Sequence, residues 1–389
     1  MSGDSKSKKI KRAVIKYVVL LTVFTIIAII LFSLLTGNDA GISRFTRLFS
    51  QRVPEITVDE FSFNVGRSRM FAQMNGSVAA VGTLGLQVLD TAGRETIRDS
   101  FRMTTPTIIS NESRCIVFDI GGSTVRVING TEILKAFETE GRIVSASINR
   151  NGWFCVVTQE SGGFKGTTMV YNSSGAVEYR VNLGSGFILS AELSPDNRSL
   201  AILNLTETGS KINFYHDLNT HKDEPDQEFY LPDGLIVDIT YLSNNEIIAI
   251  STDLLHIIKR SGTGEAIYTF EDKRLGGYTY TDNLITLHLY DYGIGNQGRL
   301  ITITQNGSIL GEIEIDREII SMSSIKNSLV VLRNDGVVFY NQNLEEYYEP
   351  SNNLSVGGAT QILAITEDIA LAASDNSAVI IKRHDDPEQ

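Results

Sequence analysis

The chain repeats a short β-hairpin pattern at a regular interval, and this repeat constrains the fold more than any other feature. Each unit has a strand, a polar turn and an apolar strand, as in "ASINRNGWFCVV" and "AELSPDNRSLAIL". The mean spacing is about 42 residues, a period that is typical of repeat architectures. The eight turns centre near Asn75, Asn111, Asn151, Asp196, Asn244, Asp282, Lys326 and Glu367.

A third strand and a weaker outer strand follow each hairpin. Val88 and Ile380 occupy equivalent third-strand positions in the first and last units, and they give the same period and the same count of eight. Four antiparallel strands in about 42 residues form one blade of a β-propeller. The sequence therefore predicts an all-β, eight-bladed β-propeller. A seven-bladed propeller with a stray hairpin is the alternative.

The last unit has only three strand-like runs before the polar residues "KRHDDPEQ". The segment "EITVDEFSFNV", residues 55–65, precedes the first hairpin and belongs to no complete unit. We expect it to pair as the outer strand of the last blade, since this leaves no unpaired strand at the seam. The propeller domain would then occupy residues 55–389.

An uncharged apolar run, "YVVLLTVFTIIAIILFSLL", occupies residues 17–35. As a helix it would be about 28 Å long, close to the thickness of the hydrocarbon core of a bilayer. The basic run "KSKKIKR" precedes it, and the positive-inside rule keeps such a run in the cytoplasm. We expect a cytoplasmic basic tail at residues 1–12, a transmembrane helix at 13–36 and a juxtamembrane linker at 37–54.

Other interpretations of the N-terminal region stay open. A cleaved signal peptide needs small residues at the cleavage site, and "SLLTGNDAG" fits that pattern poorly. A buried core helix conflicts with the flanking charges. Ile42, Phe45, Leu48 and Phe49 recur at helical spacing, so the linker is either a short helix or an irregular segment.

Charge is divided unevenly along the chain. Residues 1–36 hold six basic residues and one acidic residue. Of the chain's 34 Lys and Arg and 46 Asp and Glu, 28 basic and 45 acidic residues are left for the remainder. An acidic body is a poor partner for nucleic acid, whose binding requires cations that neutralise phosphates. We expect a single-pass protein of the cell membrane, with its N-terminus in the cytoplasm, its propeller outside and no nucleic-acid partner.

The turn "LSPDNRSLAIL", Leu193 to Leu203, is similar to the Ser-Pro-Asp-Gly turn of WD40-like propeller repeats, with Asn197 in place of glycine. With its anchor and eight diverged units, the chain resembles an uncharacterised family of bacterial membrane-anchored β-propeller proteins that contain a domain of unknown function. The resemblance also extends to quinoprotein-like propellers. It implies the propeller fold for the region after the anchor, and it brings no catalytic residues.

The stretch "VFDIGGSTVRVING" resembles the first phosphate-binding turn of the sugar-kinase and actin superfamily. In the repeat, however, it joins a second strand to a third strand, where all units have turns rich in Gly, Asn or Asp. Tight hairpins need residues that accept a positive φ, which accounts for Gly121 and Gly122 without a ligand. We therefore expect Asp119 and the two glycines to form a structural turn, with no nucleotide bound.

Other cofactor chemistry finds little support in the sequence. Quinone-dependent propeller enzymes use recurrent tryptophans, whereas this chain has one, Trp153, which we expect to pack between blades. The histidines show no metal-ligand spacing, although "HDLNTHKDEPDQ" mixes histidine with carboxylates. Cys115 and Cys155 are either small buried core residues or, outside the cell, a disulfide pair. No cofactor and no metal are expected.

Gly-rich loops on one face of the ring are the candidate binding surface. In propellers, the turns between second and third strands share a face with the connections between blades, and binding residues are often carried by such loops. The longest segments expected there are residues 159–166, 271–278, 289–298 and 349–358. The candidate partner-binding residues are Phe164, Lys165, Arg274, Tyr290, Asp291 and Tyr292.

These features predict a membrane-anchored, extracytoplasmic β-propeller that is a non-enzymatic, protein-binding scaffold at the cell envelope. The alternative from another class is a propeller enzyme or small-ligand sensor with its site at the mouth of the central channel. A purely structural assembly subunit is a third interpretation. A polar, acid-lined site at the channel would favour the second hypothesis, and exposed apolar or aromatic loops would favour the first.

Overall fold

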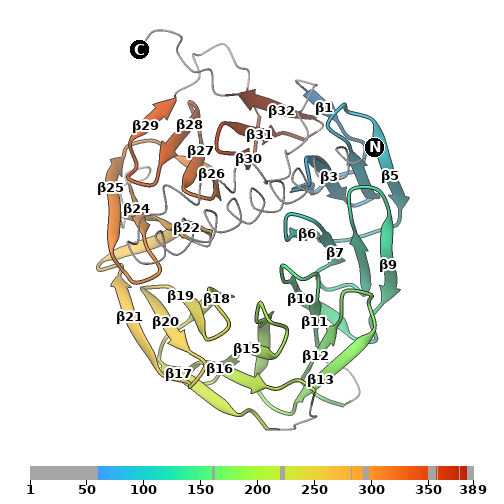
Figure 1. Ribbon diagram of the computed structural model, residues 1–389, viewed down its shortest axis with the longest axis vertical. Coiled ribbons are helices and arrows are strands. Elements are labelled where there is room, and N and C mark those ends of the chain that lie inside the picture. The colour runs from blue at the N-terminus through green and yellow to red at the C-terminus, as the bar shows by residue number, and fades with distance from the viewer. Residues whose placement is uncertain are drawn as a thin grey trace, which may run out of the picture. The chain divides into compact units, whose positions relative to one another are not determined.

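The computed structural model describes residues 60–159, 163–219, 224–281, 283–291, 298–348, 356, 358–375 and 377–382. These residues form eight four-stranded sheets, which are arranged as blades in a ring (Figure 1). Neighbouring strands within each blade are antiparallel, as in β2 with β3 and β3 with β4. The predicted eight-bladed propeller is confirmed, and the seven-bladed alternative is wrong.

Blades 1 to 4 follow one another along the chain, each with its first strand innermost. Their strands are β2 (Met70–Met74), β3 (Ser77–Gly82), β4 (Gly85–Leu89) and β5 (Glu95–Ser100); β6 (Pro106–Ser110), β7 (Cys115–Asp119), β8 (Thr124–Ile128) and β9 (Ile133–Glu138); β10 (Arg142–Ile148), β11 (Phe154–Gln159), β12 (Gly166–Tyr171) and β13 (Val177–Leu183); and β14 (Phe187–Leu193), β15 (Ser199–Thr206), β16 (Gly209–His216) and β17 (Gln227–Pro232).

Blades 5 to 7 have the same order, whereas blade 8 takes its outer strand from the other end of the sequence. Their strands are β18 (Ile236–Tyr241), β19 (Glu246–Ser251), β20 (Leu254–Lys259) and β21 (Gly264–Thr269); β22 (Lys273–Tyr280), β23 (Ile285–Asp291), β24 (Gly298–Ile303) and β25 (Ile309–Ile315); β26 (Ile319–Ile325), β27 (Ser328–Arg333), β28 (Gly336–Asn341) and β29 (Glu346–Tyr348); and β30 (Gln361–Thr366), β31 (Ile369–Ala373), β32 (Ser377–Lys382) and β1 (Glu60–Ser62).

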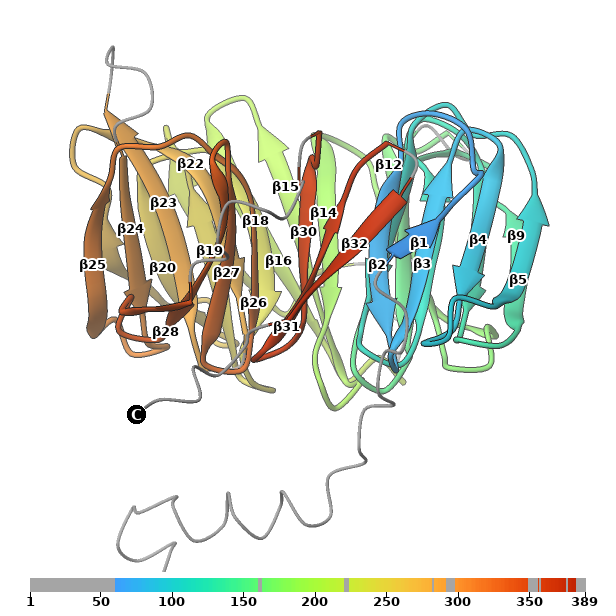
Figure 2. The ribbon, with the colours of Figure 1, turned by 90° about the horizontal axis from the view of Figure 1, so that it is seen from above.

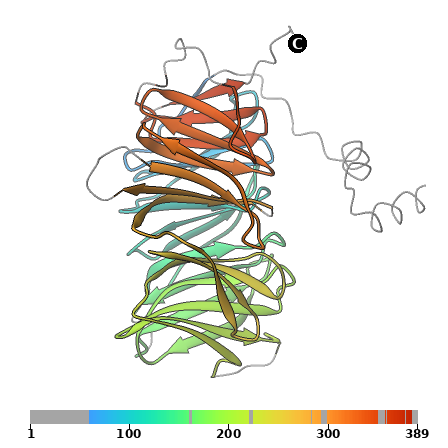
Figure 3. The same ribbon diagram turned by 90° about the vertical axis from the view of Figure 1, so that its left-hand side faces the viewer.

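The ring has two different faces, seen edge-on in Figure 2 and Figure 3. We call one face the loop face. It carries the turns between second and third strands and the connections between blades. The turn face carries the turns between first and second strands and between third and fourth strands. This division follows from the antiparallel order within each blade, since alternate turns must lie at opposite ends of the strands.

The hydrophobic core lies between blades. Eight separate clusters of buried residues each combine side chains from two neighbouring blades, including the pair formed by the last and the first. Alternate residues of β3 show the reason: Val78 and Ala80 pack toward blade 8, whereas Ala79 and Val81 pack toward blade 2. Because side chains alternate across a strand, a sheet covered on both faces needs apolar residues at every position.

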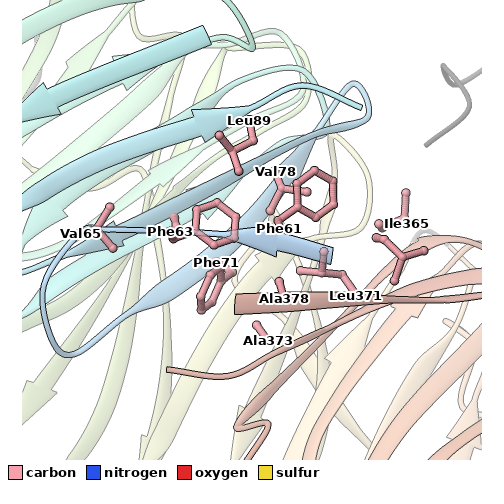
Figure 4. Packing of buried hydrophobic residues seen from close by; sticks show 12 residues of the cluster. Phe61, Phe63, Val65, Phe71, Val78, Leu89, Ile365, Leu371, Ala373 and Ala378 are labelled. Atoms are coloured by element: carbon pink, nitrogen blue, oxygen red, sulfur yellow. The ribbon is translucent and has the colours of Figure 1, made fainter. Parts of the chain in front are cut away.

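The seam between blades 8 and 1 is closed by the N-terminal strand. β1 pairs with β32, with Glu60 opposite Val379 and Ser62 opposite Ser377. Phe61 and Phe63 pack in the cluster that joins the two blades (Figure 4). The ring centroids of Phe63 and Phe71 lie 5.3 Å apart in an edge-to-face contact. Of the segment expected to close the ring, residues 55–65, the structure describes residues 60–65.

A pair of hydrogen bonds also crosses this seam. The Phe71 N–H donates to Gln361 Oε1, and Gln361 Nε2 donates to the Phe71 carbonyl oxygen, both at 3.1 Å. The Gln361 amide therefore connects the inner strands of blades 8 and 1, β30 and β2, as another strand would. The seam has both an apolar cluster and a polar connection.

Polar side chains link neighbouring blades on the turn face. Asn111 Nδ2 donates to the Asn149 carbonyl oxygen at 2.5 Å, and Asn149 Nδ2 donates to the Ser194 carbonyl oxygen at 3.0 Å. Farther round the ring, Thr281 Oγ1 donates to the Lys326 carbonyl oxygen at 2.8 Å. Polar groups of the turn face therefore form hydrogen bonds that hold neighbouring blades together.

The expected N-terminal tail, membrane span and linker, residues 1–12, 13–36 and 37–54, lie outside the described residues. Within the part of the chain that the structure describes, no helix is long and apolar enough to cross a membrane. The membrane anchor remains an expectation from the sequence.

We predict that Phe61→Ala lowers the free energy of unfolding by about 3 kcal/mol, because it removes a large side chain from the closing cluster. Phe61 is 1% exposed, whereas Val177 on the outer strand β13 is 54% exposed. Val177→Ala is therefore the control and should change stability by less than about 0.5 kcal/mol. Urea unfolding followed by circular dichroism measures both, and equal losses would contradict the assigned role of β1.

Candidate functional site

Exposed large apolar side chains collect on the loop face. Seven of the thirteen exposed large hydrophobic residues among the described residues lie there, in turns or at the first two positions of inner strands. Four others lie on outer strands, and Ile109 and Tyr280 lie on inner strands. The seven are Leu84, Ile120, Phe164, Phe187, Leu235, Val237 and Ile320.

Phe164 and Lys165 lie on the loop face as predicted. Both are exposed in the turn between β11 and β12, and Phe164 is 40% exposed. The Lys165 N–H donates to the Leu183 carbonyl oxygen at 2.9 Å, which anchors the backbone of the turn and leaves the side chain at the surface. These two candidates keep a geometry suited to contact with a partner.

Arg274, Tyr290 and Asp291 belong to strands, so their assignment to long loops is wrong. Arg274 is the second residue of β22 and lies opposite Tyr290 of β23. The side chains of Asp291 and Lys273 form an ion pair with Oδ1 and Nζ 2.5 Å apart. Tyr292 lies outside the described residues.

Two glycines explain why this segment was expected to be a loop. Gly276 and Gly277 lie inside β22, at a β-bulge. A Cβ at Gly276 would lie 2.7 Å from His288 Nδ1 and 2.8 Å from Tyr290 Cδ1. A glycine is needed there because two rings pack on the backbone, a requirement that is common where glycine interrupts a strand.

Those predicted residues that the structure describes share one face and do not form one site. Phe164 and Lys165 belong to blade 3, whereas Arg274, Tyr290 and Asp291 belong to blade 6. Most of the segment at residues 349–358 lies outside the described residues.

The sequence analysis did not identify the exposed apolar residues at the loop-face ends of inner strands, such as Phe187 and Ile320. Their only sequence signal is a large apolar residue beside polar or glycine-rich turns.

The polar groups of the Asp-Ile-Gly-Gly turn of blade 2 form hydrogen bonds within the propeller. Asp119 Oδ1 accepts hydrogen bonds from the N–H groups of Thr104 and Thr105, at 2.9 and 2.6 Å. The Gly121 N–H donates to the Ile143 carbonyl oxygen at 2.8 Å, and the Gly122 N–H donates to the Asp119 carbonyl oxygen at 2.9 Å. Asp119 thus holds the turn against the connection between β5 and β6, the Gly121 N–H group holds it against β10, and the Gly122 N–H group closes the turn itself.

Acidic and aromatic side chains gather near the axis of the ring, on the inner strands of blades 4 to 6. We call Glu192, Asp238, Tyr278 and Tyr280 the axial cluster. Burial raises the pKa of Asp238 to about 6, and a hydrogen bond from Tyr278 partly offsets this effect. Burial and the neighbouring Asp238 carboxylate raise the pKa of Glu192 well above its usual value. Both carboxyl groups therefore lose their protons at a higher pH in the folded protein than in the unfolded chain.

The two cysteines are free thiols, so the disulfide interpretation is wrong. Cys115 packs in the cluster between blades 1 and 2, and Cys155 packs in the cluster between blades 3 and 4. Whole sheets separate them, and two cysteines can be bridged only when their Cα atoms are within about 7 Å. Burial raises the pKa of each thiol to about 12, so both are poor nucleophiles.

The remaining cofactor candidates have structural contacts. Trp153 packs against the cluster between blades 3 and 4, as predicted. His216, from the expected polar turn, accepts at Nδ1 a hydrogen bond of 2.9 Å from Arg260 Nε. Within the described residues, no group of three or more His, Cys, Asp or Glu side chains is arranged to hold a metal ion.

Comparison with known proteins identifies a family. Residues 56–351 match the sequence profile described as "Family of unknown function (DUF5711)", which covers more than half of the chain. The chain belongs to the DUF5711 family. The DUF5711 match contains every strand from β1 to β29 and leaves out β30 to β32 of blade 8. No curated protein sequence matches the chain.

The solved structure of BamB supports the fold of this DUF5711 protein. BamB from Moraxella catarrhalis superposes with a TM-score of 0.52 at 15% identity, over 84% of this chain and 98% of that one. The β-propeller domain of Cps50 (Swd1) from Myceliophteria thermophila gives a TM-score of 0.49 at 12% identity, over 73% of this chain and 97% of that one. At such identities the BamB likeness shows a similar β-propeller and no more.

We predict that Asp119→Ala lowers the free energy of unfolding by about 2 kcal/mol, because it removes the buried carboxylate that accepts hydrogen bonds from two backbone N–H groups. Asp119→Asn is the matched control, since its amide oxygen still accepts a hydrogen bond, and it should lose less than half as much. Thermal unfolding measures both. Stabilisation of the wild-type protein by Mg²⁺ and ATP that Asp119→Ala abolishes would contradict a structural turn.

The axial cluster predicts a pH dependence of stability. Because the folded-state pKa of Asp238 lies near 6 and its ordinary value is 3.8, the folded protein binds more protons between these values. The free energy of unfolding should therefore fall as the pH rises from about 4 to about 6. Asp238→Asn should remove part of this slope and stabilise the protein at pH 7 by about 1 to 3 kcal/mol.

Asp233→Asn is the control for this pH dependence. Asp233 is exposed on the loop face, so its substitution should leave the slope unchanged. Urea unfolding at a series of pH values gives both slopes. If Asp238→Asn retains the full wild-type slope, other groups cause the pH dependence.

Proposed function

We propose that this protein is a membrane-anchored scaffold whose propeller lies outside the cytoplasmic membrane and binds another protein through its loop face. The observation that carries this proposal is the concentration of exposed apolar side chains on that face, which includes Leu84, Phe164 and Phe187. Single exposed apolar residues are normal, but several on one face are typical of an interaction surface.

The two faces differ in a way that supports this assignment. Polar side chains of the turn face connect neighbouring blades, as Asn111 and Asn149 do. On the loop face, a backbone hydrogen bond fixes the turn at Lys165, so that its side chain remains at the surface. A rigid scaffold that presents side chains on loops is the usual arrangement of a binding face.

The placement outside the membrane rests on the apolar run at residues 17–35 and the basic residues before it. The acidic body is consistent with a domain that does not adhere to anionic lipid. The binding role, as opposed to an enzymatic role, rests on the loop face itself, which presents apolar groups over several blades.

The axial cluster favours a second candidate, a sensor of a small ligand near the channel. Glu192 and Asp238 with Tyr278 provide carboxyl and hydroxyl groups on neighbouring inner strands. Asp238→Asn combined with Glu192→Gln separates the two candidates. A scaffold that binds through its loop face should keep its partner in this variant, whereas the ligand response of a sensor should be lost.

The experiment for the scaffold uses introduced cysteines as single reactive sites. Cys115 and Cys155 are fully buried, so they should not react with maleimides in the folded protein. Ser185→Cys places a thiol on the loop face, Asn244→Cys on the turn face and Val177→Cys on an outer strand, all at exposed positions. A membrane-impermeant maleimide should label all three variants on intact cells.

A maleimide that carries a benzophenone then tests which face binds. After illumination of cells, Ser185→Cys should give a discrete cross-linked product, and Asn244→Cys and Val177→Cys should give little or none. Labelling only after lysis would contradict the placement outside the membrane. Equal cross-linking from all three positions would contradict binding through the loop face.

A further inference from the structure

The charges of the loop face are separated into two sectors. The basic sector comprises residues 64–69, 82–85, 100–105, 119–123, 138–142, 163–166 and 183–187, on blades 1 to 3 and at the start of blade 4. It holds five cations and two exposed carboxylates, namely Arg67, Arg69, Arg102, Arg142 and Lys165 with Glu138 and Glu140. This excess of cations stands out because the chain after residue 36 is strongly acidic.

The acidic sector consists of the other charged segments of the described loop face, on blades 4 to 8. It comprises residues 206–209, 232–237, 251–254, 269–274, 291, 315–320, 333–336 and 373–375. Ten carboxylates lie there with only four cations. These are Glu207, Asp233, Asp253, Glu271, Asp272, Asp291, Asp316, Glu318, Asp335 and Asp375 with Lys273, Arg274, Arg317 and Arg333.

The cations of the two sectors differ in their partners. In the acidic sector, Lys273 pairs with Asp291, and Arg317 and Arg333 pair with Asp335. In the basic sector, Arg69 lies 3.6 Å from Asp375. The other four, Arg67, Arg102, Arg142 and Lys165, are exposed and form no ion pair within the described residues. Their charge is therefore available to a partner.

Apolar side chains are interspersed with these cations. Leu84, Ile120, Phe164 and Phe187 belong to four consecutive blades and are 57%, 40%, 40% and 58% exposed. An exposed apolar residue on each blade, with unpaired cations around it, matches a surface that has apolar groups and negative charge. Apolar groups provide affinity, and complementary charge provides orientation and a faster association rate.

We propose that the basic sector binds an acidic, amphipathic polypeptide segment of another protein; this inference rests on the proposed scaffold function. A polypeptide segment can stay within the basic sector. A lipid bilayer is a plane, and it would bring its anionic headgroups against the ten carboxylates of the acidic sector as well. Repulsion there would oppose binding, because like charges brought together across an interface cost several kcal/mol.

The test uses the full-length protein in a mild detergent and a labelled model peptide. The probe is a peptide of about 18 residues with glutamate and leucine at helical spacing, so that one face is apolar. Fluorescence anisotropy should show saturable binding that weakens as salt is added. A peptide with lysine in place of glutamate, and a scrambled glutamate–leucine peptide, should bind at least about tenfold more weakly.

Matched variants assign the binding to the basic sector. Arg102→Glu combined with Lys165→Glu should weaken binding of the acidic peptide at least about tenfold. Lys259→Glu combined with Lys326→Glu makes the same charge change at exposed sites on the turn face and should leave binding unchanged. Phe164→Ser combined with Phe187→Ser should also weaken it about tenfold. All six positions are exposed, so the variants should fold, and their unfolding temperatures verify this.

Several results would overturn the proposal. They are the absence of saturable binding of the acidic peptide, equal binding of the lysine peptide or the scrambled peptide, and equal binding by both charge variants. Binding to phosphatidylglycerol vesicles that requires Arg102 and Lys165 would identify a membrane as the ligand instead. If the acidic peptide fails while Ser185→Cys still gives its cross-link in cells, the scaffold function stands and the inferred partner chemistry is wrong.

Discussion

The packing of each blade against both neighbours is the constraint on which this propeller depends. A single four-stranded sheet such as β2 to β5 has apolar residues on both faces, and each face is covered only by another blade. The ring must therefore close, because a gap would expose two apolar faces to water. The closing strand β1 matters more than its three residues suggest, since it brings Phe61 into the cluster that spans the seam.

Because of this constraint, the two faces of the ring have different structural roles. Hydrogen bonds from Asn111, Asn149 and Thr281 hold neighbouring blades together on the turn face. The loop face also contains structural turns. In the turn at Asp119, the carboxylate accepts two backbone hydrogen bonds that hold the turn in place. Side chains that project beyond those backbone contacts, such as Phe164 and Lys165, are not needed for closure. Substitution at such positions should therefore leave the ring closed.

The sequence was sufficient for the architecture because the repeat is a local property of the chain. A period of about 42 residues, seen in two independent strand markers, predicted both the blade and the number of blades. The prediction of a loop around Gly276 was wrong for a physical reason. In a sequence, a Gly-Gly pair resembles a turn, but here one glycine makes room for His288 and Tyr290, whose positions depend on the fold.

The candidate site was less predictable, since it depends on which segments the ring brings together. Loop length pointed to Phe164 and Lys165, which the structure leaves exposed, and to Arg274 and Asp291, which it places in strands. Exposure at Phe187 or Ile320 is a property of the folded ring, and a large apolar residue beside a polar or glycine-rich turn does not by itself show whether that residue is exposed. The division into basic and acidic sectors likewise combines segments that are far apart in the sequence.

The unpaired cations and exposed apolar residues of the basic sector contribute little to folding. Even an exposed cation that has a partner adds only about 0 to 1 kcal/mol to stability, and an exposed leucine buries little apolar area. Arg102 and Leu84 therefore have no evident role in holding the ring together. A charge gradient across one face of a propeller can, however, orient an approaching partner before contact. Such a gradient would direct the acidic side of a partner toward blades 1 to 3 and away from blades 4 to 8.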